Sequence, residues 1–152
     1  MSLDVKVNSG RAQRFFKSLA ADTRKKLEGG TASIGLVAEG FTKKSIQTNS
    51  GGGETYEKYE PRRQHTASAP GDAPNSDTGD LASSIFLKVD RANLSATIGS
   101  RLEQAPALEF GTKNMAARPF LRPAANYVRP KYVKAVSDIL KEAGKLAKRK
   151  AK

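Results

Sequence analysis

Apolar residues recur every three or four positions near the start of the chain, which is the spacing of one face of an α-helix. The repeat follows Ser9, a residue type that caps helix N-termini, and consists of Ala12, Phe16, Leu19, Thr23 and Leu27. Glycine commonly ends helices, and Gly29 and Gly30 come next. The pattern therefore predicts a helix over about residues 9–28.

Alternation of apolar residues with mostly polar or small ones predicts strands farther along the chain. In residues 33–38 the apolar members are Ile34, Leu36 and Ala38, which indicates one strand. The segments "SIFLKVD" and "LSATIGS" alternate in the same way over residues 84–90 and 94–100. Only a short connection separates them, so we expect an antiparallel hairpin there.

The segment between these regions has almost no aliphatic residues after Ile46 and is rich in Gly, Ser, Pro, Asn and charged residues. Such composition cannot offset the entropy of ordering the chain. We expect a long loop over about residues 42–77 that is mobile in the free protein and becomes ordered when it docks on a neighbouring protein. Tyr and Arg are favoured at interfaces, and the loop offers Tyr56, Tyr59, Arg62 and Arg63 as a possible interface.

Short helical turns are expected on either side of the hairpin. Thr78 is a suitable N-cap for "GDLASSI", and "EQAPALEFG" ends in Gly111.

The last third of the chain predicts a long helix, with Pro123 in its first turn. A continuous apolar stripe, suited to the core or to a subunit contact, is formed by Ala125, Val128, Tyr132, Val136, Ile139, Ala143 and Leu146. Pro130 interrupts this stripe and predicts a kink or a break.

These elements predict an α+β fold in a single domain, residues 1–152, in which helices pack a small, mostly antiparallel sheet. The chain carries a net charge of +12, concentrated in its basic helical C-terminus, about residues 123–152. From Lys113 to Lys152 there are twelve Lys or Arg residues against two acidic ones. This asymmetry fits an anionic neighbour, either a polyanion or an acidic protein surface, and equally fits a solvated helix face.

The residue types needed for catalysis or metal binding are scarce. The chain has no Cys, and its one His, His65, falls in the expected loop. Asp72, Asp77 and Asp80 cluster in sequence, but caps and turns explain them better than a cation site does. We expect that the protein is not an enzyme and that it binds no cofactor and no metal ion. No apolar run is long enough for a membrane span, and the first residues have no secretory signal pattern.

One segment, "EFGTKNMAARPFLRP", combines turn, proline, aromatic and arginine signals in residues 109–123. Gly111 permits a tight turn, and Pro119 and Pro123 restrict how the chain enters the long helix.

Within the same segment, Phe120 and Leu121 are expected to pin the long helix to the sheet. Arg118 and Arg122 are expected to contact backbone carbonyls or a neighbour's carboxylate; the alternative is that they face DNA. The segment is thus interpreted as a structural clasp.

Two stretches resemble a family of tailed-phage structural proteins. "APGDAPNSDTGDLASSI", Ala69 to Ile85, is similar to its Pro-Gly-X-Pro-Pro and Thr-Gly-X-Leu-X-X-Ser-Ile pattern. "ALEFGTKNMAARPFLRPA", Ala107 to Ala124, is similar to its second signature. The family is that of the head–tail joining or tail-completion (neck) proteins of long-tailed phages, often labelled minor tail components. The matching positions are Glu109, Phe110, Gly111, Thr112, Arg118, Pro119, Phe120, Leu121, Arg122 and Pro123.

The resemblance implies a non-enzymatic α+β subunit that forms a ring, commonly a hexamer, at the head-proximal end of the tail. Such a ring joins the tail terminator or tail tube to the head connector, and DNA passes through its channel with only non-specific contacts. The implied location is the virion, and the host cytoplasm during assembly. The sequence departs from the family pattern at Pro130 and in the long loop before Pro70. A competing hypothesis is a small basic nucleic-acid-binding protein that uses the C-terminal segment.

Overall fold

A computed structural model describes residues 9–49, 51–59 and 62–150. Its elements are, in order, α1 (Ser9–Thr48), β1 (Gly52–Tyr59), β2 (Arg62–Ser68), α2 (Asp80–Ser84), β3 (Ile85–Asp90), β4 (Ser95–Ser100), α3 (Ala105–Phe110) and α4 (Leu121–Lys150). The α+β class is confirmed. The strands form two separate antiparallel pairs, β1–β2 and β3–β4.

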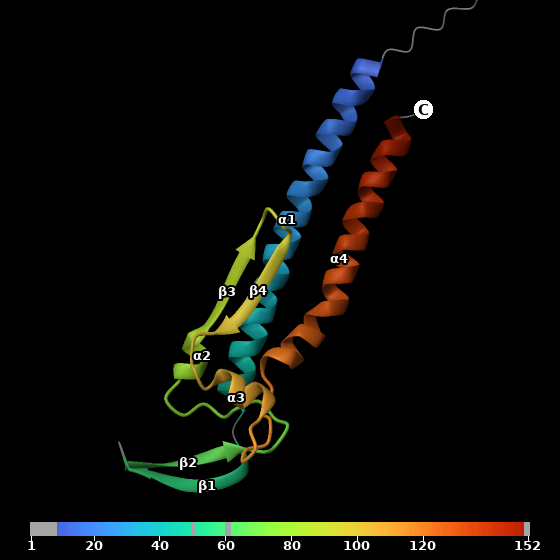
Figure 1. Cartoon of the computed structure of the whole chain (residues 1–152). Helices are drawn as coiled ribbons and strands as arrows, with labels where there is room; N and C mark the ends of the chain where they lie inside the picture. Colours follow the sequence, from blue (N-terminus) through green and yellow to red (C-terminus); the bar gives the residue numbers. More distant parts are fainter. Residues whose placement is uncertain (1–8, 50, 60–61, 151–152) are drawn as a thin grey trace, which may run out of the picture.

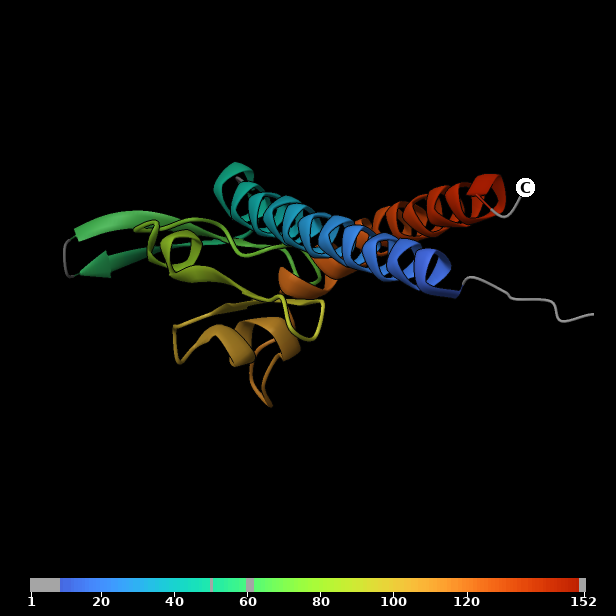
Figure 2. The same ribbon diagram turned by 90° about the horizontal axis from the view of Figure 1, so that it is seen from above.

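The two long helices give the molecule its elongated shape (Figure 1). α1 and α4 run antiparallel, so that the start of α1 and the end of α4 reach the same end of the molecule. The β3–β4 hairpin packs along the middle of α1, and the β1–β2 hairpin lies at the opposite end from the C-terminus, as the view from above also shows (Figure 2).

The prediction that the first helix ends at Gly29 is wrong, and so is the strand predicted over residues 33–38, because α1 continues to Thr48. The buried positions of its second half are three or four residues apart, as a helix requires: Thr31, Gly35, Ala38, Thr42 and Ile46. At Gly35 an added Cβ would lie 2.7 Å from Leu87 Cδ1. Glycine therefore serves close packing against β3 in this helix.

The predicted hairpin at residues 84–100 is confirmed, with Leu87 opposite Ile98 in the β3–β4 register. The Asp90 carboxylate closes its turn, because Oδ1 accepts the backbone N–H groups of Ala92 at 2.9 Å and of Asn93 at 3.1 Å. Hydrogen bonds from Asn93, first from its side chain, lower the pKa of Asp90.

The prediction of a long loop over residues 42–77 is wrong for much of its length. Residues 42–48 belong to α1, and β1 and β2 form a hairpin in which Tyr56 pairs with His65. His65 therefore lies on a strand, not in a loop. This hairpin has few aliphatic side chains and is held partly by polar contacts between its strands. The Thr55 and Thr66 hydroxyls, for example, lie 2.8 Å apart across the strands.

The two short helices are present, but the first has a different cap. Gly79, with φ 85°, occupies the N-cap position of α2 predicted for Thr78. Thr78 Oγ1 still accepts the backbone N–H of Asp80 at 3.4 Å. α3 confirms the predicted turn before Gly111.

The core is small and lies where α1, α2, β3, α3 and the start of α4 meet. Its buried members are Ile46, Ala82, Ile85, Ala105 and Phe120. Phe120 is completely buried there, and Leu121 packs against the same cluster half-buried. The prediction that both residues pin the helix to the sheet needs correction, because of the two sheets only the first residue of β3 reaches this core.

α4 confirms the predicted long helix and holds Pro123 in its first turn. Pro130 does not break it, since the helix is continuous across this residue, but α4 changes direction early in its length (Figure 1). Its inner face packs on α1: the Tyr127 ring stacks on Phe41 with centroids 4.5 Å apart, and Ile139 lies against Gly30.

Candidate assembly site

The Glu109 carboxylate caps the N-terminus of α4 from outside that helix. Its Oε2 accepts the backbone N–H groups of Phe120 at 2.8 Å and Leu121 at 2.9 Å, and its Oε1 accepts that of Arg122 at 2.9 Å. Glu109 itself is buried. Because the first N–H groups of a helix have no partner inside it and carry a partial positive charge, a buried carboxylate is well matched to this position.

The connection between α3 and α4 is tied to its surroundings by further backbone contacts. Gly111 has φ 77°, and a Cβ there would lie 2.8 Å from the Met115 carbonyl oxygen. Thr112 pairs with Met115 as an isolated bridge. Arg118 donates its backbone N–H to the Leu108 carbonyl at 2.7 Å and its Nε–H to the Ser68 carbonyl at 3.1 Å. The clasp predicted for residues 109–123 thus joins α3, α4 and the end of β2.

Four motif residues lie outside the tightest part of this clasp. Phe110 exposes 70% of its surface, and the Arg122 guanidinium carbon lies 5.5 Å from the centroid of its ring. Pro119 is half-buried and Pro123 exposed. Of the two arginines, Arg118 reaches a backbone carbonyl as expected, whereas Arg122 lies over an aromatic ring.

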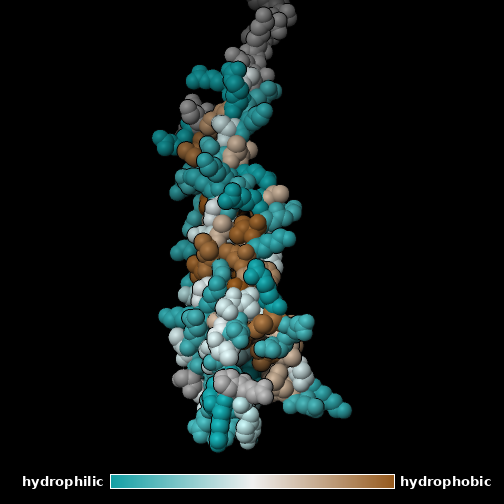
Figure 3. Space-filling view, turned by 90° about the vertical axis from the view of Figure 1, so that its left-hand side faces the viewer, coloured by the Kyte–Doolittle hydropathy of each residue, from teal (hydrophilic) through white to brown (hydrophobic). Residues whose placement is uncertain are grey.

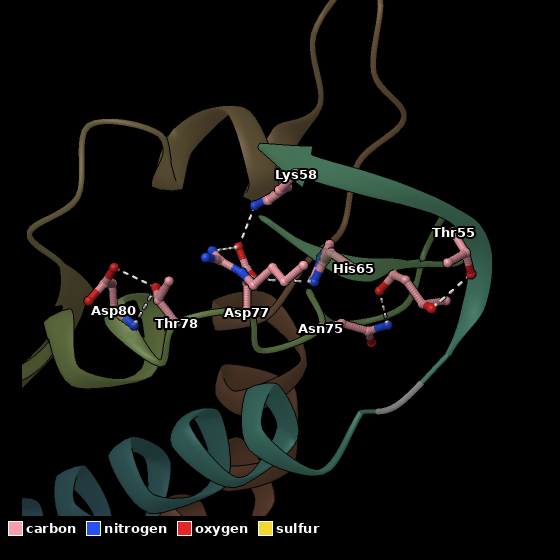
Figure 4. A network of polar contacts seen from close by, with 9 residues as sticks. Thr55, Lys58, His65, Asn75, Asp77, Thr78 and Asp80 are labelled. Carbon is pink, nitrogen blue, oxygen red and sulfur yellow. Dashed lines mark hydrogen bonds and ion pairs between the residues drawn. The ribbon is translucent and has the colours of Figure 1, made fainter. Parts of the chain in front are cut away.

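The Asp77 carboxylate lies against three side chains of the β1–β2 hairpin (Figure 4). Arg63 binds it with both Nε–H and Nη2–H, at 2.8 and 2.9 Å. Lys58 donates to the same carboxylate, and His65 Nδ1 lies 3.5 Å from it. Hydrogen bonds from Arg63, then from Lys58, hold the pKa of Asp77 well below its usual range. Asn75 adds a side-chain hydrogen bond to the Thr66 carbonyl at 2.8 Å.

The four residues proposed for an interface loop all lie on this hairpin or at its end. Tyr56 and Tyr59 expose 46% and 77% of their surfaces. The Arg62 side chain is exposed and lies 3.3 Å from Glu57. The Arg63 guanidinium is bound to Asp77, so this side chain stabilises the hairpin.

Between the β1–β2 hairpin and α3 lies a groove of about 970 Å³, which we call the hairpin groove. Tyr56 and His65 form an aromatic pair on it, with ring centroids 5.6 Å apart. Leu108 and Met115 contribute apolar surface. Ser68 Oγ and Asn75 Oδ1, also among its lining residues, are buried and have no hydrogen-bond partner within the described part of the chain.

At the other end of the molecule, residues 9–30 of α1 and 131–149 of α4 form what we call the basic arm. The Lys26 ammonium lies 2.8 Å from the Glu142 carboxylate between the two helices. The arm contains four acidic residues against twelve basic ones: Arg11, Arg14, Lys17, Arg24, Lys25, Lys26, Lys131, Lys134, Lys141, Lys145, Lys148 and Arg149. The basic C-terminal helix noted in the sequence is therefore joined in space by a second basic helix.

The protein exposes much apolar surface for its size. Hydrophobic residues gather midway along the face shown in Figure 3, and Leu36 and Val133 each expose 61% of their surface. The chain has an accessible surface of 11118 Å², whereas a compact monomer of 16.3 kDa is expected to have roughly 7,500 Å². Even fully extended, the residues outside the described ranges contribute only about 2,000 Å².

Within the described residues, no group of three His, Cys, Asp or Glu side chains is arranged to hold a metal ion. Asp77, one of the acidic residues considered for a cation, is occupied by Lys58 and Arg63. No helix in this part of the chain is both long and apolar enough to cross a membrane.

Sequence reasoning listed Glu109 only as a motif position and missed both its capping role and the anchoring role of Asp77. The partners of Asp77 lie 14 and 19 residues away, so no local pattern connects them. For Glu109 a signal existed, namely a lone acidic residue in an otherwise apolar turn, shortly before a proline-bounded helix start.

Comparison with protein-family models finds no match to this chain, and comparisons with curated proteins and with solved structures find none either. The resemblance to phage tail-completion proteins therefore rests on the two sequence motifs.

Proposed function

We propose that the protein is a non-enzymatic assembly subunit of a phage virion, acting as a ring-forming tail-completion or head–tail joining component. The main support for this proposal is that the chain has more accessible surface than a compact monomer of its size and exposes large apolar side chains. Surface of this kind is typical of subunits that bury it against neighbours. The proposed partners are further copies of the chain, the tail terminator or tail tube, and the head connector.

The second motif supports the same proposal. Residues 109–123 form a rigid clasp held by the buried Glu109 carboxylate, and none of its contacts suggests a catalytic role. A subunit that must fit a ring needs its long helix at a fixed angle to the rest of the domain, and this cap determines where α4 begins.

Sedimentation velocity over a wide concentration range tests the proposal, with negative-stain imaging of any large species. We expect association with rising concentration and closed rings in the images. A protein that stays monomeric at every concentration, and does not associate when purified tail-tube or head-connector proteins of its source particle are added, contradicts it.

A second candidate function, nucleic-acid binding, is favoured by the basic arm. Binding of this kind depends on phosphate contacts, and its affinity falls steeply with salt. Lys134, Lys141 and Lys148 are exposed at seven-residue spacing on α4. If the arm binds DNA, changing all three to Gln lowers the slope of log affinity against log salt by about 2–3.

The matched control for the DNA experiment changes three exposed lysines outside the arm, namely Lys44, Lys88 and Lys113, to Gln. Both variants lose the same total charge, so only the position of the charge differs. For the assembly function we expect weak duplex binding with no sequence preference. Nanomolar, sequence-dependent binding at physiological salt favours the second candidate instead.

A further inference from the structure

Phe110 exposes 70% of its surface although the backbone on both sides of it is firmly held. On one side of it Glu109 is held by three backbone N–H groups, and on the other Gly111 is packed too tightly to accept a Cβ. Arg122 stacks over the ring. An exposed aromatic ring with a guanidinium beside it has the composition of an interface hot spot, and the held backbone fixes the position of the ring before binding.

The hairpin groove has the complementary features. Tyr56 offers an aromatic face at its edge, and Leu108 and Met115 offer apolar surface inside it. Its acidic lining residues include Glu54, which is exposed and takes part in no ion pair among the described residues. An aromatic ring can pack on Tyr56, while a neighbouring guanidinium can meet the Glu54 carboxylate.

Ala107 and Leu108 of α3 line the groove, but Phe110 of the same helix does not. The groove is therefore not filled by the Phe110 ring of its own copy. Two different patches of one chain that fit each other produce a heterologous, head-to-tail contact, which closes into a ring when the rotation permits.

We propose that Phe110 of one copy occupies the hairpin groove of the next copy, with Arg122 facing Glu54 across the contact. The proposal rests on the assembly function proposed above and adds to it the surfaces that meet. It assigns the Asp77 contacts a purpose, since they hold the hairpin that forms one wall of the groove.

Four variants test the contact by sedimentation velocity. Phe110→Ser removes the inserted ring, and Gln104→Trp places bulk on an exposed lining position of the groove. Arg122→Glu and Glu54→Arg reverse the two facing charges. The matched control is Phe16→Ser, which removes an aromatic that exposes 55% of its surface on α1, outside the groove.

We expect Phe110→Ser and Gln104→Trp each to weaken association by at least about 30-fold, while Phe16→Ser associates like wild type. An equimolar mixture of the two defective proteins should form dimers and nothing larger, because one retains the groove and the other retains the ring. Each charge reversal should weaken association, and the double reversal should restore it.

The outcomes separate the two proposals. If wild type associates and Phe110→Ser associates within threefold of it, the proposed contact is wrong and the assembly function stands. If the mixture of defective proteins stays monomeric although each protein is folded by circular dichroism, the head-to-tail pairing is wrong. If wild type never self-associates but joins added tail-tube or head-connector proteins, the proposed contact is wrong and the assembly function stands. If it associates neither with itself nor with those proteins, both proposals fail.

Discussion

The carboxylate of Glu109 accepts the backbone N–H of Phe120 at 2.8 Å, across eleven residues of sequence. This bond joins the last turn of α3 to the start of α4 and sets the most buried aromatic side chain in place. Because the same carboxylate also takes the N–H groups of Leu121 and Arg122, one side chain satisfies three successive donors. One residue of α3 therefore caps the start of α4.

Replacing Glu109 with Ala should lower the free energy of unfolding by at least about 3 kcal/mol, because buried N–H groups lose a charged acceptor. Glu109→Gln keeps one side-chain oxygen as an acceptor and should lose less. Urea unfolding followed by circular dichroism measures both. Glu103→Ala, at an exposed glutamate nearby, is the control and should change little; equal stability of Glu109→Ala and this control would sink the capping role.

Two phenylalanines in one motif should respond in opposite ways to truncation. Phe120 is fully buried and Phe110 is 70% exposed. Phe120→Ala should cost about 3–5 kcal/mol of stability through lost burial and the cavity it leaves, whereas Phe110→Ala should change the stability of the monomer by less than about 0.5 kcal/mol. Thermal unfolding at a concentration where the protein is monomeric compares them. Similar losses for both would contradict the placement of the core.

Replacing glycines of α1 with alanine should change stability in opposite directions, depending on what surrounds each glycine. Gly40→Ala meets nothing within 4 Å and should stabilise the protein by about 0.5–1 kcal/mol, since alanine is the better helix former. Gly35→Ala places a Cβ 2.7 Å from Leu87 Cδ1 and 3.0 Å from Ala96 Cβ, and should destabilise by about 1–3 kcal/mol. Unfolding curves of the two variants give the comparison. A stabilising Gly35→Ala would show that β3–β4 does not pack closely on α1.

The attachment of the β1–β2 hairpin should depend on pH through Asp77. Its pKa is depressed in the folded state, so its contribution is fully present above the unfolded pKa of about 3.9 and is lost as the pH falls toward the folded pKa. Tyr56 ring signals in NMR spectra should therefore shift toward those of a detached hairpin only below about pH 4.

Asp77→Asn should produce the same detached-hairpin signals at neutral pH, because the neutral amide cannot form ion pairs with Arg63 and Lys58. Asp72→Asn changes an exposed carboxylate that makes no side-chain contact among the described residues, and serves as the control. Unchanged Tyr56 signals in Asp77→Asn would mean that strand pairing alone holds the hairpin.

The sequence by itself determined the elements whose signals are local. The β3–β4 hairpin follows from alternation on both sides of a short connection, and α4 follows from a long apolar repeat. The turn at Gly111 could also be predicted, because glycine readily adopts the positive φ that it has there. The burial of Phe120 could be predicted because an aromatic residue lies between two prolines at the start of a helix.

Tertiary structure decided the rest. Ile34 and Ala38 fit an alternating pattern as well as a helical one, and Gly29–Gly30 is a normal helix end. The cost of two helical glycines is about 2 kcal/mol, which packing of α1 against β3–β4 and α4 offsets. The β1–β2 hairpin could not be predicted, because an isolated strand pair with few aliphatic residues is only marginally stable alone. It is held by Asp77, whose partners become neighbours only after the chain has folded.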